Sequence, residues 1–97
     1  MEKDIQFPDQ YARRDNGIWF LAIVDDVNTS CSISDEFIDQ IIREDSVASY
    51  LDVFMDKKDI IYKLAEYKIS NNSYGEDGNI AITLEDDSEL IDKVSID

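Results

Sequence analysis

The feature that most constrains this chain is a predicted β-hairpin between Gly17 and Ser34. Its first strand, residues 18–24, is a continuous run of β-branched, aromatic and other apolar side chains, Ile-Trp-Phe-Leu-Ala-Ile-Val. Such a run is typical of a central strand with both faces covered. A polar turn follows, and the second strand, residues 28–33, alternates between apolar and polar side chains, which predicts one face in contact with water. We therefore expect an antiparallel sheet covered by helices on one face.

The residues after the hairpin predict two helices. Ser34 is a favourable N-cap and the next apolar side chains share one helical face, so a short helix is expected at residues 35–44. No glycine or proline interrupts residues 46–70, where an apolar stripe predicts a long second helix. A break near Asp56 and Lys57 is left open.

Two further segments predict strands. Residues 79–84 alternate well, and residues 5–7 form a short piece before Pro8 that suits the edge of a sheet. The predicted fold class is therefore α+β, with two layers: a three- to four-stranded antiparallel sheet and two helices packed on one face. Residues 1–87 are expected to form this single domain, followed by an acidic C-terminal segment at residues 88–97.

The first strand of the hairpin is apolar on both faces, although helices are predicted for only one. Trp19 or Phe20 should anchor the core beneath the helices. The predicted helices cover only one face, so Trp19, Leu21 and Ile23 need a cover of their own. Either residues 88–97 or a second copy of the chain would supply it, and we favour a homodimer.

Length and composition indicate one small domain. The chain has 97 residues, 43% of them hydrophobic, which is enough for one core. No apolar run approaches the ~20 residues that span a bilayer, and the N-terminus does not resemble a secretion signal. Cys31 is the single cysteine, so an internal disulfide is excluded. These features together predict a cytoplasmic location.

The net charge is strongly negative. The sequence holds 23 acidic and 9 basic residues, a balance of −14. Such a charge opposes direct binding to nucleic acid or to an anionic membrane. It favours a basic protein partner, because opposite charge speeds their encounter. The alternative is that the charge serves only solubility.

Few residues suggest catalysis or cofactor binding. There is no histidine, which excludes the usual Ser-His, Cys-His and His-metal sites. Cys31 is a candidate nucleophile, but a small buried side chain in the sheet is the favoured interpretation. Asp25-Asp26 with Asn28 and Ser30 resembles the start of a calcium loop, D-x-N-x-S. Cys31 stands where the loop needs glycine, and Phe37 stands where it needs the final glutamate. We expect no cofactor, no metal and no enzymatic activity.

Several short motifs occur in an order that resembles a known family. The chain carries Ile5-Gln6-Phe7-Pro8-Asp9, then Phe20-Leu21-Ala22-Ile23-Val24-Asp25, then Cys31-Ser32-Ile33-Ser34. This order is similar to a family of small bacterial domains of unknown function with the pattern I-x-F-P-D, F-x-A-x-V-[DG] and C-x-I-S. The resemblance covers about residues 4–84. It implies a two-layer α+β domain without an established activity, and the acidity of this chain is not inherited from it.

Three functional hypotheses follow. The first is a non-enzymatic acidic module that binds and inhibits a basic, nucleic-acid-handling protein, as immunity proteins, antitoxins and phage anti-defence or nucleic-acid-mimic proteins do. The second is a bacterial accessory domain of unknown function whose acidity serves only solubility. The third is a weak metal binder or small enzyme. Under the first hypothesis, the expected partner contacts are the acids of the long helix and of the region after the last strand: Asp52, Asp56, Asp59, Glu66, Glu85, Asp86, Asp87 and Glu89.

Overall fold

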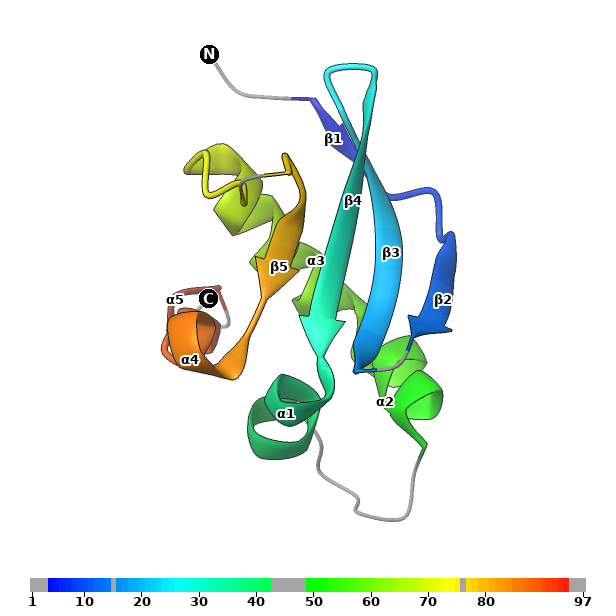
Figure 1. Cartoon of the computed structure of the whole chain (residues 1–97), viewed down its shortest axis with the longest axis vertical. Helices are drawn as coiled ribbons and strands as arrows, with labels where there is room; N and C mark the ends of the chain where they lie inside the picture. The colour runs from blue at the N-terminus through cyan, green and yellow to red at the C-terminus, as the bar shows by residue number, and fades with distance from the viewer. Residues whose placement is uncertain (1–3, 15, 43–48, 76, 95–97) are drawn as a thin grey trace.

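The computed structural model describes residues 4–14, 16–42, 49–75 and 77–94 and confirms an α+β fold (Figure 1). A sheet forms one layer and helices form the other. Within the described residues, no helix has the length and apolar character that crossing a membrane would require. The strands are β1 (Ile5–Gln6), β2 (Tyr11–Arg14), β3 (Gly17–Val24), β4 (Val27–Ser34) and β5 (Ile80–Ile82), and the helices are α1 (Asp35–Phe37), the π-helix η1 (Ile38–Ile42), α2 (Tyr50–Asp56), α3 (Lys58–Ser70), α4 (Leu84–Asp87) and α5 (Leu90–Val94).

The predicted hairpin is confirmed and forms the middle of the sheet. β3 pairs with β4 in antiparallel register over their whole length, from Gly17 opposite Ser34 to Val24 opposite Val27. The turn places Asp25 and Asp26 at φ angles of 51° and 70°. Positive φ at both central residues is the requirement of a type I′ turn, whose twist suits a two-residue hairpin.

The edge beyond β3 is longer than predicted. β1 and β2 both pair with β3, β1 at the end near Val24 and β2 at the end near Gly17. The chain between them departs at Asp9, whose φ is 61°. One interrupted edge strand therefore occupies this side, and β2 lies in a segment for which no strand was predicted.

The prediction of an entirely antiparallel sheet is wrong for the last strand. β5 pairs with β4 in parallel, with Cys31 opposite Ile80 and Ile33 opposite Ile82. The helices between the two strands return the chain to the start of β4 before β5 begins, as in a crossover connection. The result is a mixed sheet of five strands.

A serine caps the N-terminus of both α1 and α2. The Ser34 hydroxyl accepts a hydrogen bond from the Phe37 N–H at 3.1 Å at the start of α1. Ser49 caps α2 in the same way. The long predicted helix is broken at Lys57, so α2 and α3 are separate helices. The end of the first predicted helix and the start of the second fall at residues 43–48, outside the described residues.

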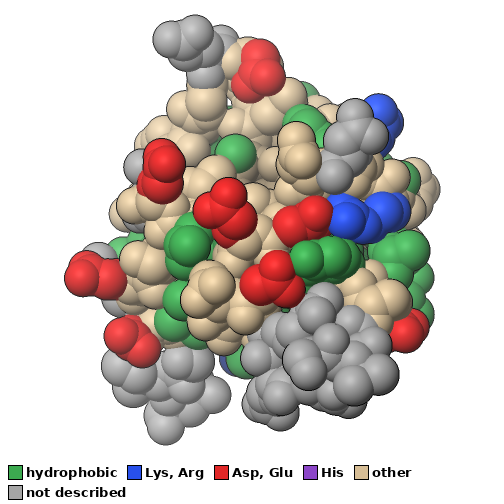
Figure 2. Space-filling view, turned by 60° about the horizontal axis from the view of Figure 1, so that its bottom comes forward, with side chains coloured by type: hydrophobic (Ala, Val, Ile, Leu, Met, Phe, Trp, Pro, Cys, Tyr) green, Lys and Arg blue, Asp and Glu red, His purple; other side chains and the backbone are tan. Residues whose placement is uncertain are grey.

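Acidic side chains are spread over the surface. The face in Figure 2, which brings the bottom of Figure 1 forward, shows Asp and Glu side chains as separate groups divided by uncharged surface. In this view the negative charge is dispersed and does not form one continuous patch.

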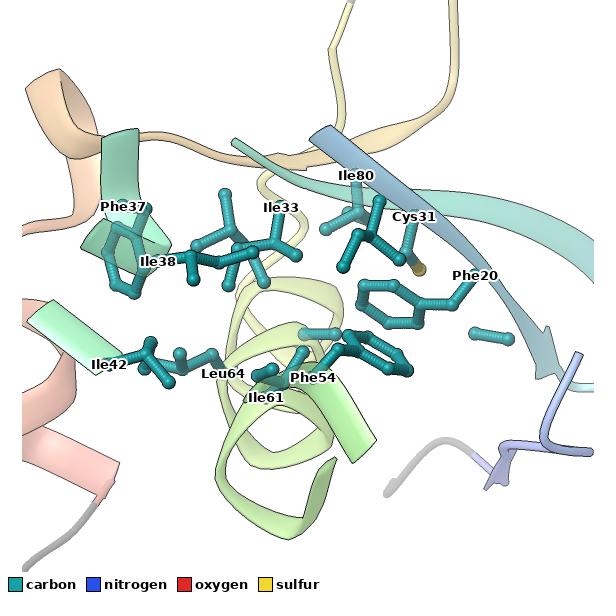
Figure 3. Packing of buried hydrophobic residues seen from close by; sticks show 14 of the residues in the cluster. Phe20, Cys31, Ile33, Phe37, Ile38, Ile42, Phe54, Ile61, Leu64 and Ile80 are labelled. Carbon is teal, nitrogen blue, oxygen red and sulfur yellow. The ribbon is translucent and has the colours of Figure 1, made fainter. Parts of the chain in front are cut away.

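The core lies between the inner face of the sheet and the helices (Figure 3). Phe20 is 3% exposed, and its ring lies 5.6 Å from that of Phe54 on α2. Of the two predicted anchors, Phe20 is therefore the one in the core. The largest fully buried side chains around it come from β3, β4, β5 and every helix from α1 to α3: Phe37, Phe54, Ile18, Ile33, Ile38, Ile61, Leu64, Ile69, Ile80 and Ile82.

The C-terminal segment docks on the helices. α5 packs against α3, and Leu90 and Ile91 join the core from this side. The described part of the segment, up to residue 94, therefore does not cover the second face of β3.

Truncating a side chain in this core should destabilise the fold. Phe54→Ala and Ile82→Ala are each expected to lower the free energy of unfolding by ~2–5 kcal/mol, because both side chains are fully buried and would leave cavities. Chemical denaturation measures the change. Glu66→Ala on the exposed side of α3 is the control, and losses below ~1 kcal/mol at the two core sites would contradict this packing.

Candidate functional site

The face of the sheet opposite the helices has no covering element among the described residues. In Figure 1, α3 passes behind β4 and β5, so this face is turned toward the reader. Side chains alternate along a strand. Trp19, Leu21 and Ile23 therefore point away from the core and are half-buried. We call this surface the open sheet face; it comprises Trp19, Leu21 and Ile23 with the strand neighbours on the same side, Gln6, Ala12, Arg14, Asn28, Ser30, Ser32 and Ala81.

Trp19 stands among small side chains on this face. It lies opposite Ala12 on β2 and Ser32 on β4, and Ser32 in turn lies opposite Ala81 on β5. A large ring in a row of small residues leaves a hollow on each side. The hollow toward β5 has a volume of about 410 Å³ and the one toward β2 about 280 Å³, and Trp19 borders both.

Gly17 allows the two central strands to approach closely beside the larger hollow. A Cβ at this position would collide with the Ile33 carbonyl oxygen on β4. Glycine is therefore needed here for close backbone approach and not for an unusual φ. Gly17, Ser32, Ser34 and Thr83 are among the residues that line this hollow.

The two adjacent arginines of β2 have different environments. Arg13 is held by the Asp35 carboxylate at 2.9 Å, by the Gly17 carbonyl oxygen at 2.9 Å and by the face of the Tyr50 ring at 4.6 Å. Arg14 borders both hollows, and none of the described carboxylates forms an ion pair with it. Among the described residues, no aspartate or glutamate lines either hollow. In a chain of net charge −14, this face is neutral to basic.

The predicted acidic contacts lie elsewhere. Those of the long helix are all exposed on α2 and α3, and Glu85 and Glu89 are exposed near α4. The side chain of Asp86 is outside the described residues. The structure therefore separates two surfaces: carboxylates on the outer side of the helices, and the open sheet face on the other side of the sheet. The exposed acids on the helix side include Asp52, Asp56, Asp59 and Glu66.

Asp87 is a correction to the predicted contacts, because it is buried. It is 7% exposed, and its carboxylate pairs with the Lys68 ammonium at 2.8 Å. The Thr83 N–H donates to the same carboxylate at 2.9 Å, and Lys68 also donates to the Ala81 carbonyl oxygen. This group ties α4 to α3 and to the end of β5, so Asp87 serves the fold and not a partner surface.

One sequence signal could have identified this pair. Lys68 lies on the apolar stripe of its helix, where a charged side chain is rare unless it has a partner. Asp59 and Lys63 are one helical turn apart, but this pair is not among the ion pairs that the described residues form.

The remaining chemical candidates are arranged for structure. Cys31 is fully buried, and burial raises the pKa of its thiol to about 12, so it is protonated at neutral pH. Asp25 accepts a hydrogen bond from the Asp4 N–H at 2.9 Å as part of the hairpin tip. The described residues contain no group of three or more acidic or cysteine side chains placed to hold a metal ion.

One exposed carboxylate has a clear electrostatic environment. Hydrogen bonds from Lys58 and from the Tyr62 hydroxyl lower the pKa of Asp9. Burial, together with this carboxylate, raises the pKa of Tyr62. Tyr62 also stacks on Phe7, with ring centroids 4.3 Å apart. These contacts bind the bend of the edge strand to α3, so they too are structural.

Comparison with known proteins relates the chain to proteins without an assigned activity. Residues 5–82 match the model of a family described as "Protein of unknown function (DUF1488)". A crystal structure of a protein of unknown function from this family, from Shewanella loihica PV-4, is similar with a TM-score of 0.74 and 22% identity. The similarity covers 84% of this chain and 94% of that chain, and at this identity it shows the fold alone. No curated protein matches the chain.

The Lys68–Asp87 pair should be costly to break from one side. Asp87→Asn or Lys68→Met alone should lower the free energy of unfolding by ~3–5 kcal/mol, because each leaves a buried charge without its partner. The double variant should lose less than the sum of the two. Denaturant titration of all four proteins gives this coupling, and strictly additive losses would mean that the two groups do not interact.

Cys31 should be protected from thiol reagents in the folded protein. Its reaction with an aromatic disulfide reagent is expected to be slower than in the denatured chain by a factor on the order of 10³ or more, because the thiol reacts only when the fold opens. Absorbance of the released thiolate follows the reaction. Complete labelling of the native protein at the denatured rate would instead indicate an accessible, reactive cysteine.

Proposed function

The chain belongs to the DUF1488 family of proteins of unknown function, and we propose that it is a non-enzymatic interaction module whose acidic helix surface binds and inhibits a basic, nucleic-acid-handling protein. The observation that carries this proposal is the pattern of charge on α2 and α3. Asp52, Asp56, Asp59 and Glu66 are all exposed on these two helices.

The cations of the same helices do little to neutralise this surface. Lys58 pairs with Asp9 at 3.1 Å, and Lys68 is buried with Asp87. Lys57 lies 3.9 Å from the Asp56 carboxylate, and Lys63 is exposed on α3. A basic surface that normally holds phosphates would meet a net excess of carboxylates here.

An apolar anchor is available beside these acids. Met55 is 50% exposed on α2, next to Asp56 and one turn from Asp52. Charges at the rim of an interface mainly speed association, whereas the central hot spot is usually a well-packed apolar or aromatic group. Met55 supplies a flexible group of this kind, since methionine adapts its shape to its partner. Tyr74, which follows α3 and is 37% exposed, is a second exposed side chain that could act as an anchor.

The acids after β5 lie on the helix side of the molecule too. Glu85 and Glu89 are exposed, while Asp87 is withdrawn into the fold. α5 packs on α3, which places this region on the helix side of the molecule. We therefore keep Glu85 and Glu89 as partner contacts, together with Asp86, and omit Asp87.

A second function is favoured by the dispersal of carboxylates in Figure 2. Charge spread in separate groups is typical of a protein kept soluble by repulsion. Under this alternative the chain is a bacterial accessory domain whose acidic residues bind no partner and serve only solubility. The two proposals differ in whether the position of the acids matters or only their number.

The test compares two variants with the same change in charge. The helix variant carries Asp52→Asn, Asp56→Asn, Asp59→Asn and Glu66→Gln, and the control carries Asp25→Asn, Asp26→Asn, Asp77→Asn and Glu36→Gln. Binding to a basic protein isolated with the parent chain from native cytosol is followed by surface plasmon resonance at several salt concentrations. The helix variant should associate more slowly by a factor on the order of ten, and rising salt should remove the difference.

A third variant examines the region after β5, with Glu85→Gln, Asp86→Asn and Glu89→Gln. It should slow association less than the helix variant, because it removes fewer charges. If the helix variant, this variant and the control all bind as fast and as tightly as the parent, the acidic surface is not the contact and the charge serves solubility.

A further inference from the structure

On the open sheet face, charged and apolar side chains follow one another in order from one end of β3 to the other. Arg14 lies opposite Gly17 at one end of the strand. Trp19, Leu21 and Ile23 follow on the same face. The hairpin tip with Asp25 forms the other end, beside Asp26 and Asp4. A cation on β2, three apolar side chains on β3 and a group of carboxylates therefore succeed one another in the direction of β3.

Leu21 is the midpoint of this order. It lies four positions after Gly17, the level of Arg14, and four positions before Asp25. A two-fold axis that passes Leu21, perpendicular to β3 and in the plane of the face, exchanges the two ends of the pattern. The axis keeps every strand at the same position across the sheet, so Arg14 of one copy faces the Asp4 end of β1 of the other, level with Asp25. Trp19 faces Ile23, and the two Leu21 side chains meet near the axis.

We propose that the open sheet face is a homodimer interface in which two copies pack face to face, antiparallel, about an axis at Leu21. Isologous interfaces of this kind require a self-complementary patch. The pattern along β3 is self-complementary in both polarity and charge. The half-buried Trp19 ring, with hollows on both sides, provides the relief that two stacked sheets need to interlock at a spacing of about 10 Å.

The charge of the face favours a second copy over the basic protein of the proposed function. Arg14 borders both hollows, and none of the described residues that line them is a carboxylate, so a basic surface would be repelled here. A second copy brings apolar side chains and the Asp4 carboxylate in the required register. The dimer would leave the acidic side of α2 and α3 free, so this inference is independent of the proposed function.

The size of the face sets the strength of the dimer. β3 has eight residues and the face is four strands wide, which gives a projected area of roughly 450 Å² for each copy at ordinary strand spacings. Both copies together would bury about 900 Å², at the low end for specific interfaces. We therefore expect a dimer that dissociates on dilution.

The experiment is sedimentation velocity of the full chain over a range of concentrations up to the millimolar. The parent should change from monomer to dimer within this range. Leu21→Lys places two ammonium groups at the axis and should weaken the dimer at least tenfold. Met55→Lys, an equal change on the exposed side of α2, is the matched control and should leave the dimer intact. Thermal unfolding confirms that each variant is folded.

A charge exchange tests the antiparallel arrangement. Arg14→Glu alone should weaken the dimer about fivefold, because two rim pairs become repulsive. Adding Asp4→Lys should restore it, since each new lysine would meet the new glutamate of the other copy. A parent that remains monomeric at every concentration, or a Leu21→Lys variant that dimerises as the parent does, would overturn the proposal. Failure of the exchange to restore the dimer would overturn the antiparallel orientation.

Discussion

The packing of Phe20 on β3 against Phe54 on α2 decides how the two faces of the sheet are used. Their rings lie 5.6 Å apart, and both side chains are almost or entirely excluded from water. Because side chains alternate along β3, burying Phe20 commits Ile18, Ala22 and Val24 to the same side. It commits Trp19 to the opposite side with equal certainty. The core and the open sheet face are thus two consequences of one register.

A second constraint is the accommodation of charge. A chain of net charge −14 repels itself when it becomes compact. The fold keeps most of its described carboxylates at the surface, and the buried one, Asp87, is neutralised by Lys68 and satisfied by the Thr83 N–H. Arg13 likewise pairs with a carboxylate, that of Asp35, and so joins β2 to the start of α1. Basic residues are few, and several of them are used to hold elements together.

These two constraints give the molecule two unlike sides. Exposed acids such as Asp52 and Asp59 lie on the helices, and the sheet presents Trp19 and Arg14. The proposed basic partner suits the first side, and a second copy suits the other. Both contacts can exist together, since they share none of their residues. A dimer would also present two acidic helix surfaces, which would increase the avidity for a partner with repeated basic sites.

The sequence by itself determined the features that depend on neighbouring residues. The hairpin of β3 and β4, the cap at Ser34, the burial of Cys31 and the α+β class all follow from alternation, turn residues and side-chain type within short windows. The family resemblance was also present in short motifs. The acids of α2 and α3 were correctly expected at the surface because helical periodicity separates them from the apolar stripe.

Only the tertiary structure decided the rest. The parallel pairing of β5 depends on where the helices return the chain, which alternation within residues 79–84 cannot reveal. Whether Trp19 or Phe20 faces the core depends on which side the helices cover, because both faces of β3 are apolar. Asp87 resembles its acidic neighbours in sequence, and its burial arises from a partner 19 residues away. Local patterns indicate which side chains can be buried, whereas packing between distant elements selects those that are.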